Sequence, residues 1–187
     1  MFSYSRLKNR MVYAIGGKQP DILLSGYTKY NSHIQTWEVI RMNYEIVQLG
    51  QKTIAGVSAI TGNNDPRVSE IIGGLWGQLY QEGISGRINN KINDCAIGLY
   101  SDYVEDNYCV TVGHEVSAPA NDELTIKAIP AGNYAKFSVR GHIERAVVEA
   151  WNEIWKMDLD RSFTGDFEEY LNGDREEAII EIYIALK

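Results

Sequence analysis

Residues that build disulfides and metal sites are scarce in this sequence. Its 187 residues include two cysteines, Cys95 and Cys109, and three histidines on separate segments. Both cysteines lie in apolar, alternating stretches, which favours buried thiols over a disulfide. Scattered histidines are a poor basis for a His-rich metal site. We therefore expect neither a disulfide nor a bound metal, and we predict no cofactor.

Long apolar runs are also missing. No segment approaches the ~20 consecutive apolar residues that a membrane-spanning helix needs. The first residues, MFSYSRLKNR, carry charges but no apolar stretch of signal-peptide length. The sequence therefore predicts a cytoplasmic protein without membrane contact.

Familiar catalytic motifs are not found either. Gly16-Gly17-Lys18 lacks the spacing of a phosphate-binding loop, and no second histidine follows His114-Glu115 at the spacing of a zinc protease. There is no Gly-x-Ser-x-Gly nucleophile elbow. These absences lean against an enzyme but leave the question open.

Charge divides the chain into two parts. Residues 1–43 carry six basic and two acidic residues, a net charge of +4, whereas residues 44–187 carry 12 basic and 23 acidic residues, a net charge of −11. The basic part is rich in Tyr and turns and lacks the helical pattern of a DNA-binding module. The acidic part argues against direct nucleic-acid contact and favours cationic partners. We predict a basic N-terminal extension, 1–43, open to a protein partner or self-association, and a domain, 44–187.

The predicted domain repeats one pattern. Leu49 and Leu124 each open an apolar strand, and the tryptophans Trp76 and Trp151 follow in helices; both pairs are 75 residues apart. Two further strands complete each copy, CAIGLYSDY with NYCVTVGHEV and then DFEEYL with IIEIYIAL. The pattern predicts an α+β fold with two antiparallel sheets under two helices. Repeated units bury their faces on each other, and the seam between them is a natural ligand site.

An acidic and aromatic cluster stands out in the second copy. Strand alternation along residues 166–170 puts Glu168 and Tyr170 on one face and Phe167 and Glu169 on the other. A carboxylate on an inner face is costly unless it is paired or serves a ligand. Among aromatic rings its complement is an organic cation, which also gains cation–π contact. The rings expected to wall such a pocket are Trp76, Tyr103, Tyr108, Phe137 and Trp151. Equally compatible with composition is a core of rings with Glu168 at its rim.

Several stretches resemble the GyrI-like effector-binding domain, the C-terminal ligand sensor of AraC-type and MerR-type bacterial regulators, which also occurs alone. The resemblance rests on IPAGNYAKFSVRG, EAWNEIW, DFEEYL and EIYIAL, with YEIVQLGQKTIAGVSA and IGLYSDYVEDNYCVTVG in the first copy. It implies duplicated β-α-β-β units, a curved antiparallel sheet with two helices, and a central ligand cleft on a pseudo-twofold axis. It also implies that Glu168, the acid of the Phe-Glu-x-Tyr pattern, contacts the ligand. Ligands of this family are lipophilic cations and other small toxic molecules.

Three functional hypotheses follow. The leading one is a stand-alone small-molecule-binding protein whose ligand is cationic and amphipathic, with Glu168 as counter-charge. The second is a hydrolase of reactive small molecules in the same cleft, since a buried Glu beside a Tyr can act as general acid or base. The third is an interaction module that acts on a regulator or a topoisomerase through residues 1–43. We expect no transcription regulation by this chain alone, because no DNA-binding domain is recognisable.

Overall fold

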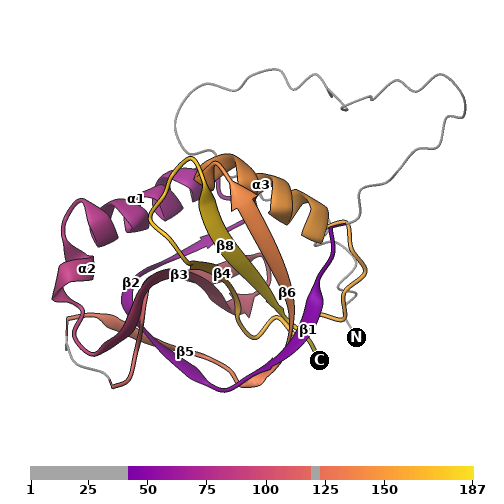
Figure 1. The fold of residues 1–187 in the computed structure, drawn as a ribbon, viewed down its shortest axis with the longest axis horizontal. Helices are drawn as coiled ribbons and strands as arrows, with labels where there is room; N and C mark the ends of the chain where they lie inside the picture. Colours follow the sequence, from indigo (N-terminus) through magenta and orange to yellow (C-terminus); the bar gives the residue numbers. More distant parts are fainter. Residues whose placement is uncertain (1–41, 119–122) are drawn as a thin grey trace, which may run out of the picture.

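The computed structural model describes residues 42–118 and 123–187 (Figure 1). Nearly all of the predicted basic extension, residues 1–43, therefore falls outside the described residues. The helices and strands are β1 (Glu45–Leu49), β2 (Lys52–Gly62), α1 (Val68–Tyr80), α2 (Ile84–Arg87), β3 (Lys91–Val104), β4 (Asn107–Val116), β5 (Thr125–Ile129), β6 (Gly132–Gly141), α3 (Ile143–Ile154), β7 (Asp166–Tyr170) and β8 (Ala178–Ala185).

The eight strands of the described residues form one antiparallel sheet in the order β1-β6-β8-β7-β3-β4-β2-β5. The alternation pattern alone had predicted two sheets, and that was wrong. The two halves join because all of β7 pairs with the middle of β3, from Ala96 opposite Tyr170 to Tyr100 opposite Asp166. The curved single sheet implied by the family resemblance is confirmed: it curls into a half-barrel, and α1 and α3 lie over the same face (Figure 1).

The predicted duplication is visible in the topology. One unit is β2-α1-β3-β4 and the other is β6-α3-β7-β8, with the short helix α2 added in the first. Their strands lie in the sheet as β2-β4-β3 beside β7-β8-β6, so β3 and β7 meet at the centre. The outer strands are exchanged, since β1 pairs with β6 of the second unit and β5 with β2 of the first.

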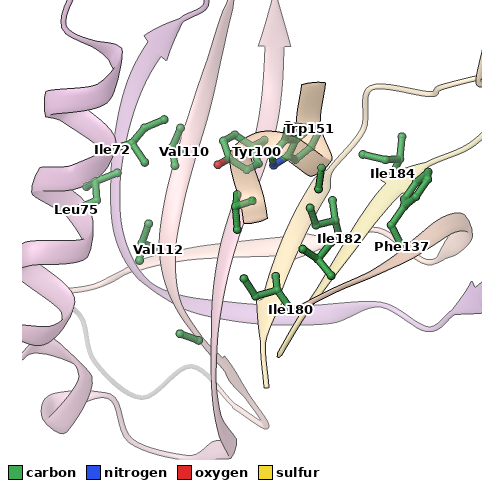
Figure 2. Packing of buried hydrophobic residues seen from close by; sticks show 14 of the residues in the cluster. Ile72, Leu75, Tyr100, Val110, Val112, Phe137, Trp151, Ile180, Ile182 and Ile184 are labelled. Carbon is green, nitrogen blue, oxygen red and sulfur yellow. The ribbon is translucent and has the colours of Figure 1, made fainter. Parts of the chain in front are cut away.

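Alternation along the strands makes two apolar clusters, one on each face of the sheet. Under the helices, Val110 and Val112 of β4 face Ile72 and Leu75 of α1 (Figure 2). The opposite face carries a smaller cluster that includes the ring of Phe167. Burial of these side chains, at about 25 cal/mol per Å² of apolar surface, holds the helices on the sheet.

The predicted burial of the two cysteines is confirmed for Cys109, whereas Cys95 is less buried than predicted. Cys95 is half-buried and Cys109 is buried, and both are free thiols. Among the described residues, no helix combines the length and apolar character required to cross a membrane.

Candidate functional site

Glu168 lies in β7 at the centre of the sheet, opposite Gly98 of β3 on one side and Ile182 of β8 on the other. Its side chain faces the helices and the residue is only 2 % exposed. Phe167 belongs to the cluster on the opposite face, and Glu169 there lies near Lys52. The predicted alternation of this strand is therefore correct, but Glu168 is buried deep in the face and not at a rim.

Three neutral rings donate hydrogen bonds to the Glu168 carboxyl. Oε1 accepts from the hydroxyl of Tyr100 at 3.1 Å and from the indole Nε1 of Trp151 at 2.5 Å. Oε2 accepts from the hydroxyl of Tyr170 at 2.6 Å. Burial raises the pKa of Glu168, and these donors oppose the rise only in part. The carboxyl is thus hydrogen-bonded but its charge is not neutralised by these donors.

A second buried acid on the same strand, Asp166, has a cationic partner that Glu168 does not have among the described residues. Asp166 is fully buried, and its Oδ2 accepts from the guanidinium of Arg161 and from the hydroxyl of Tyr103 at 3.0 Å. Its Oδ1 accepts from the backbone N–H of Ala185 at 2.8 Å. Asp166 therefore has the cationic partner that a buried carboxylate ordinarily needs. Glu168, on the same face two residues later, has rings around it instead.

On the α1 side, Trp76 forms the wall of the site. A Cβ at Gly98 would lie 3.3 Å from Cζ2 of Trp76 and 3.5 Å from Oε2 of Glu168, so the indole sits over this glycine. The ring of Trp76 meets that of Tyr170 edge-on, with centroids 4.9 Å apart, and stacks on Tyr80 at 6.2 Å. Trp76 and Tyr170 are half-buried, whereas Tyr100 and Trp151 are buried. Trp76 and Tyr170 are therefore the least buried of the four rings around the carboxyl.

On the other side, the rings continue toward the β3–β4 hairpin. Tyr100 packs on Trp151 at 5.7 Å and on Tyr108 at 5.8 Å, and Tyr108 packs on Tyr103 at 5.9 Å. The hydroxyl of Tyr108 is buried and has no hydrogen-bond partner among the described residues. Burial raises the pKa of this hydroxyl, which therefore stays neutral. Unlike the hydroxyls of Tyr100 and Tyr103, it is a buried polar group without a hydrogen bond in the described part of the chain.

The duplicated fold places these groups in matched pairs. Trp76 and Trp151 come from the corresponding helices α1 and α3, and each approaches the carboxyl. Tyr100 and Tyr170 each lie two residues after the Gly98–Glu168 pair in their own strand. The candidate site therefore lies at the junction of the two units, where the repeat predicted a ligand.

The structure brings together six of the seven residues predicted for the site. Phe137 is the exception: it is fully buried in β6, two strands from Glu168, and its ring packs on Tyr44 at 5.2 Å. Figure 2 shows it beside Ile184, away from Tyr100 and Trp151. Tyr100 was missed in the sequence. The position of Tyr100 two residues after Gly98 in IGLYSDY puts both on one face of the strand, which was the available signal. The sequence did not show that β7, which carries Glu168, is the neighbouring strand.

A separate hollow of about 300 Å³ lies at the end of the β3–β4 hairpin. Its lining consists of Ile60, Asp102, Val104, Asn107, Tyr108, Cys109 and Lys127. Asp102 and Lys127 form an ion pair of 2.5 Å there, so both charges are already satisfied. Within residues 42–118 and 123–187, no three His, Cys, Asp or Glu side chains are arranged to hold a metal ion. Glu168 and its rings remain the strongest candidate site.

Comparisons with known proteins bear on the family and the fold. The family model of the GyrI-like small molecule binding domain matches residues 42–187, which confirms the resemblance found in the sequence. YobU of Bacillus subtilis (strain 168), named as a candidate transcriptional regulator, is 35% identical over 159 residues, which are 76% of this chain and 96% of YobU.

Solved structures share the fold. The structure of SAV2435 bound to tetraphenylphosphonium superposes with a TM-score of 0.68 at 21% identity, covering 78% of this chain and 94% of that one. A candidate transcription regulation protein from Staphylococcus aureus MU50 gives a TM-score of 0.64 at 23% identity, over 78% and 99% of the two chains. An integron cassette protein of Vibrio cholerae gives 0.61 at 24%, over 77% and 95%.

Proposed function

Because the chain belongs to the GyrI-like small molecule binding domain family, which is related to the sensor domains of bacterial regulators, we propose that it binds a lipophilic organic cation at Glu168. The observation that carries this proposal is a buried carboxyl whose three hydrogen-bond donors within residues 42–118 and 123–187 are all neutral rings. A cation would supply the missing charge, and the rings of Trp76 and Tyr170 would cover it. The SAV2435 structure, which holds tetraphenylphosphonium in the same fold, is consistent with this ligand class.

The energetics favour a cation over a neutral molecule of the same shape. A unit charge about 4 Å from a carboxylate is attracted by roughly 4 kcal/mol at an effective dielectric constant of 20. Each ring that faces the cation adds about 0.5–2 kcal/mol. Because burial raises the pKa of Glu168, the carboxyl releases its proton when a cation binds, and the attraction must exceed the free energy of that release.

Binding requires a rearrangement, because Glu168 is 2 % exposed. The Trp76–Tyr170 pair is the part of the wall that is half-buried, and its edge-on contact is the one that a ligand would displace. Tyr100 and Trp151, which are buried deeper, would keep their hydrogen bonds to Oε1. We place the ligand between α1 and the centre of the sheet, against Oε2.

The experiment is isothermal titration with three probes. Tetraphenylphosphonium, tetraphenylborate and triphenylphosphine oxide offer a cation, an anion of the same shape and a neutral relative. Glu168→Gln should weaken the phosphonium at least tenfold, about 1.4 kcal/mol, and change the neutral probe less than threefold. Glu169→Gln is the matched control, since this neighbour lies on the opposite face near Lys52. Equal losses for the cation and the neutral probe would contradict the charge role.

A protein partner or self-association through residues 1–43, and a cytoplasmic location, stay predictions. Deleting residues 1–41 leaves the described domain whole, so phosphonium binding should persist in the shortened protein. Loss of that binding, with the fold retained by circular dichroism, would assign the extension to the binding site.

A further inference from the structure

A serine and a histidine outside the Glu168 site form a hydrogen-bonded pair. Oγ of Ser85, in the short helix α2, lies 2.8 Å from Nε2 of His114 in β4. The other ring nitrogen, Nδ1, lies 2.9 Å from the backbone carbonyl oxygen of Cys95 in β3. His114 is 2 % exposed, whereas Ser85 is half-buried. The histidine is therefore fixed at both nitrogens, and the serine remains within reach of solvent.

The partners decide which nitrogen carries the proton. A carbonyl oxygen only accepts, so Nδ1 of His114 must donate to Cys95. Burial lowers the pKa of His114, so the ring is neutral near pH 7. Nε2 then has a free lone pair and accepts the hydrogen bond from the hydroxyl of Ser85. The hydrogen bonds therefore run in the direction found in enzymes with a serine nucleophile: the hydroxyl of Ser85 donates to the base His114, and the carbonyl of Cys95 orients that base.

The pair lies on the helix side of the sheet, in line with the Glu168 site. His114 is opposite Ala96 of β3, and Ala96 is opposite Tyr170 of β7. At ~4.8 Å between neighbouring strands, two strand spacings put His114 about 10 Å from Tyr170. Along α1, Tyr80 stacks on Trp76, and burial together with nearby Cys95 raises the pKa of Tyr80. The stacked rings of Trp76 and Tyr80 therefore extend from the Glu168 site toward Cys95, whose backbone carbonyl oxygen bonds to His114.

We propose that Ser85 is a nucleophile, with His114 as its general base, and that the pair accepts an acyl group from small activated esters. The serine oxygen attacks the ester carbonyl carbon while its proton passes to Nε2 of His114. The bond to the alcohol then breaks, and the alcohol leaves with that proton. Water, deprotonated by the same nitrogen, attacks the acyl-serine, and the carboxylic acid is released as Ser85 regains its proton.

The chemistry stands apart from the cation site, because neither Ser85 nor His114 contributes to the hydrogen bonds of Glu168. Cation binding could fail while Ser85 reacts, and the reverse is equally possible. A purely structural hydrogen bond that fastens α2 to β4 is the alternative, and it predicts an unreactive serine.

The test is labelling with a fluorophosphonate, followed by intact mass and peptide mapping. Attack by Ser85 forms a phosphorus–oxygen bond, expels fluoride and passes the serine proton through His114 to solvent. Ser85→Ala should remove the adduct. His114→Asn, whose amide can still donate to Cys95, should slow labelling about 100-fold, the usual worth of a general base. Ser58→Ala is the matched control, since Ser58 is half-buried and bonded to Thr125 at 2.9 Å, not to an imidazole.

The pH profile of the wild-type protein gives a readout that needs no variant. Labelling should fall tenfold per pH unit once His114 is protonated, below its lowered pKa. The groups that act on this ring are Cys95, Lys91 and Asp94, all of β3. A flat profile, no adduct at Ser85, or equal labelling of Ser85 in His114→Asn would each overturn the proposal.

Discussion

Replacing Glu168 by glutamine should stabilise the ligand-free protein. The gain in unfolding free energy should grow as the pH rises above 4.5, the ordinary pKa of a glutamate. The cause is that burial raises the folded-state pKa of Glu168 from an ordinary 4.5. At a pH between the pKa of Glu168 in the unfolded state and its higher pKa in the folded state, the folded protein holds a proton that the unfolded protein has lost. Stability therefore falls with rising pH in this window, and the wild-type protein is most stabilised by this group below pH 4.5. Because glutamine does not titrate, the stability of the variant lacks this fall with pH.

The size of the stability difference follows from the change of unfolding free energy with pH and from the hydrogen bonds that glutamine can keep. Each pH unit within the window costs the wild-type protein about 1.4 kcal/mol relative to the variant. Glutamine is nearly isosteric, so its carbonyl oxygen can accept from Tyr100 and Trp151 as Oε1 does. Its amide can donate to the hydroxyl oxygen of Tyr170, which then reverses its role. The stability difference should therefore reflect the charge and little else.

Urea unfolding of both proteins from pH 4.5 to pH 9 measures this difference. The gap between them should widen from pH 4.5 upward and become constant above the folded-state pKa of Glu168. Burial also raises the pKa of Glu169, but that group is present in both proteins and cancels in the difference. A gap that stays constant over the whole range, or that narrows with pH, would refute a raised pKa at Glu168.

Three further predictions concern the ring of Tyr170 beside Glu168, the close contact of two strands at Gly56 and the buried ion pair of Asp166. Tyr170→Phe removes the hydroxyl that lowers the pKa of the buried carboxyl, so half-maximal phosphonium binding should move to higher pH; a pH titration of affinity that does not move would contradict this. Gly56→Ala would put a Cβ 2.1 Å from the carbonyl oxygen of Val112 and should cost about 3 kcal/mol in urea unfolding, whereas an unchanged midpoint would mean that the strands separate easily. Asp166→Asn leaves Arg161 without its buried partner and should cost about 3–5 kcal/mol by the same assay; a loss below about 1 kcal/mol would show that water replaces the pair.

Local patterning predicted much of this fold. In β6, Tyr134 lies in the apolar cluster on one face of the sheet, whereas Ala135 and Phe137 lie in the cluster on the other face, as strand alternation requires. Trp151, which was predicted to lie in a helix, is buried on the core side of α3. Such patterns work because each residue's environment is set by its own strand or helix. The joining of the two halves into one sheet depends on β3 meeting β7, which no local pattern encodes.

The same limit explains what was missed in the site. Glu168 and Tyr170 share a strand, so their common face was predictable. Tyr100 comes from the other unit, and its contact with Glu168 depends on the register of Ala96 opposite Tyr170. Phe137 was placed in the site on its residue type alone. Its face was right, but strand order separates it from Glu168 by the width of β8.

The symmetry of the duplicated units is broken where β3 meets β7, since one unit has Gly98 where the other has Glu168. Two glutamates there would bring their Cβ atoms to about 5 Å across the strands, and the like charges would repel. Gly98 instead admits the indole of Trp76 from one unit against the carboxyl of the other. A ligand between the halves therefore meets a nearly twofold aromatic frame with its negative charge on one side. Even a symmetric cation should therefore bind off the axis, on the side of Glu168.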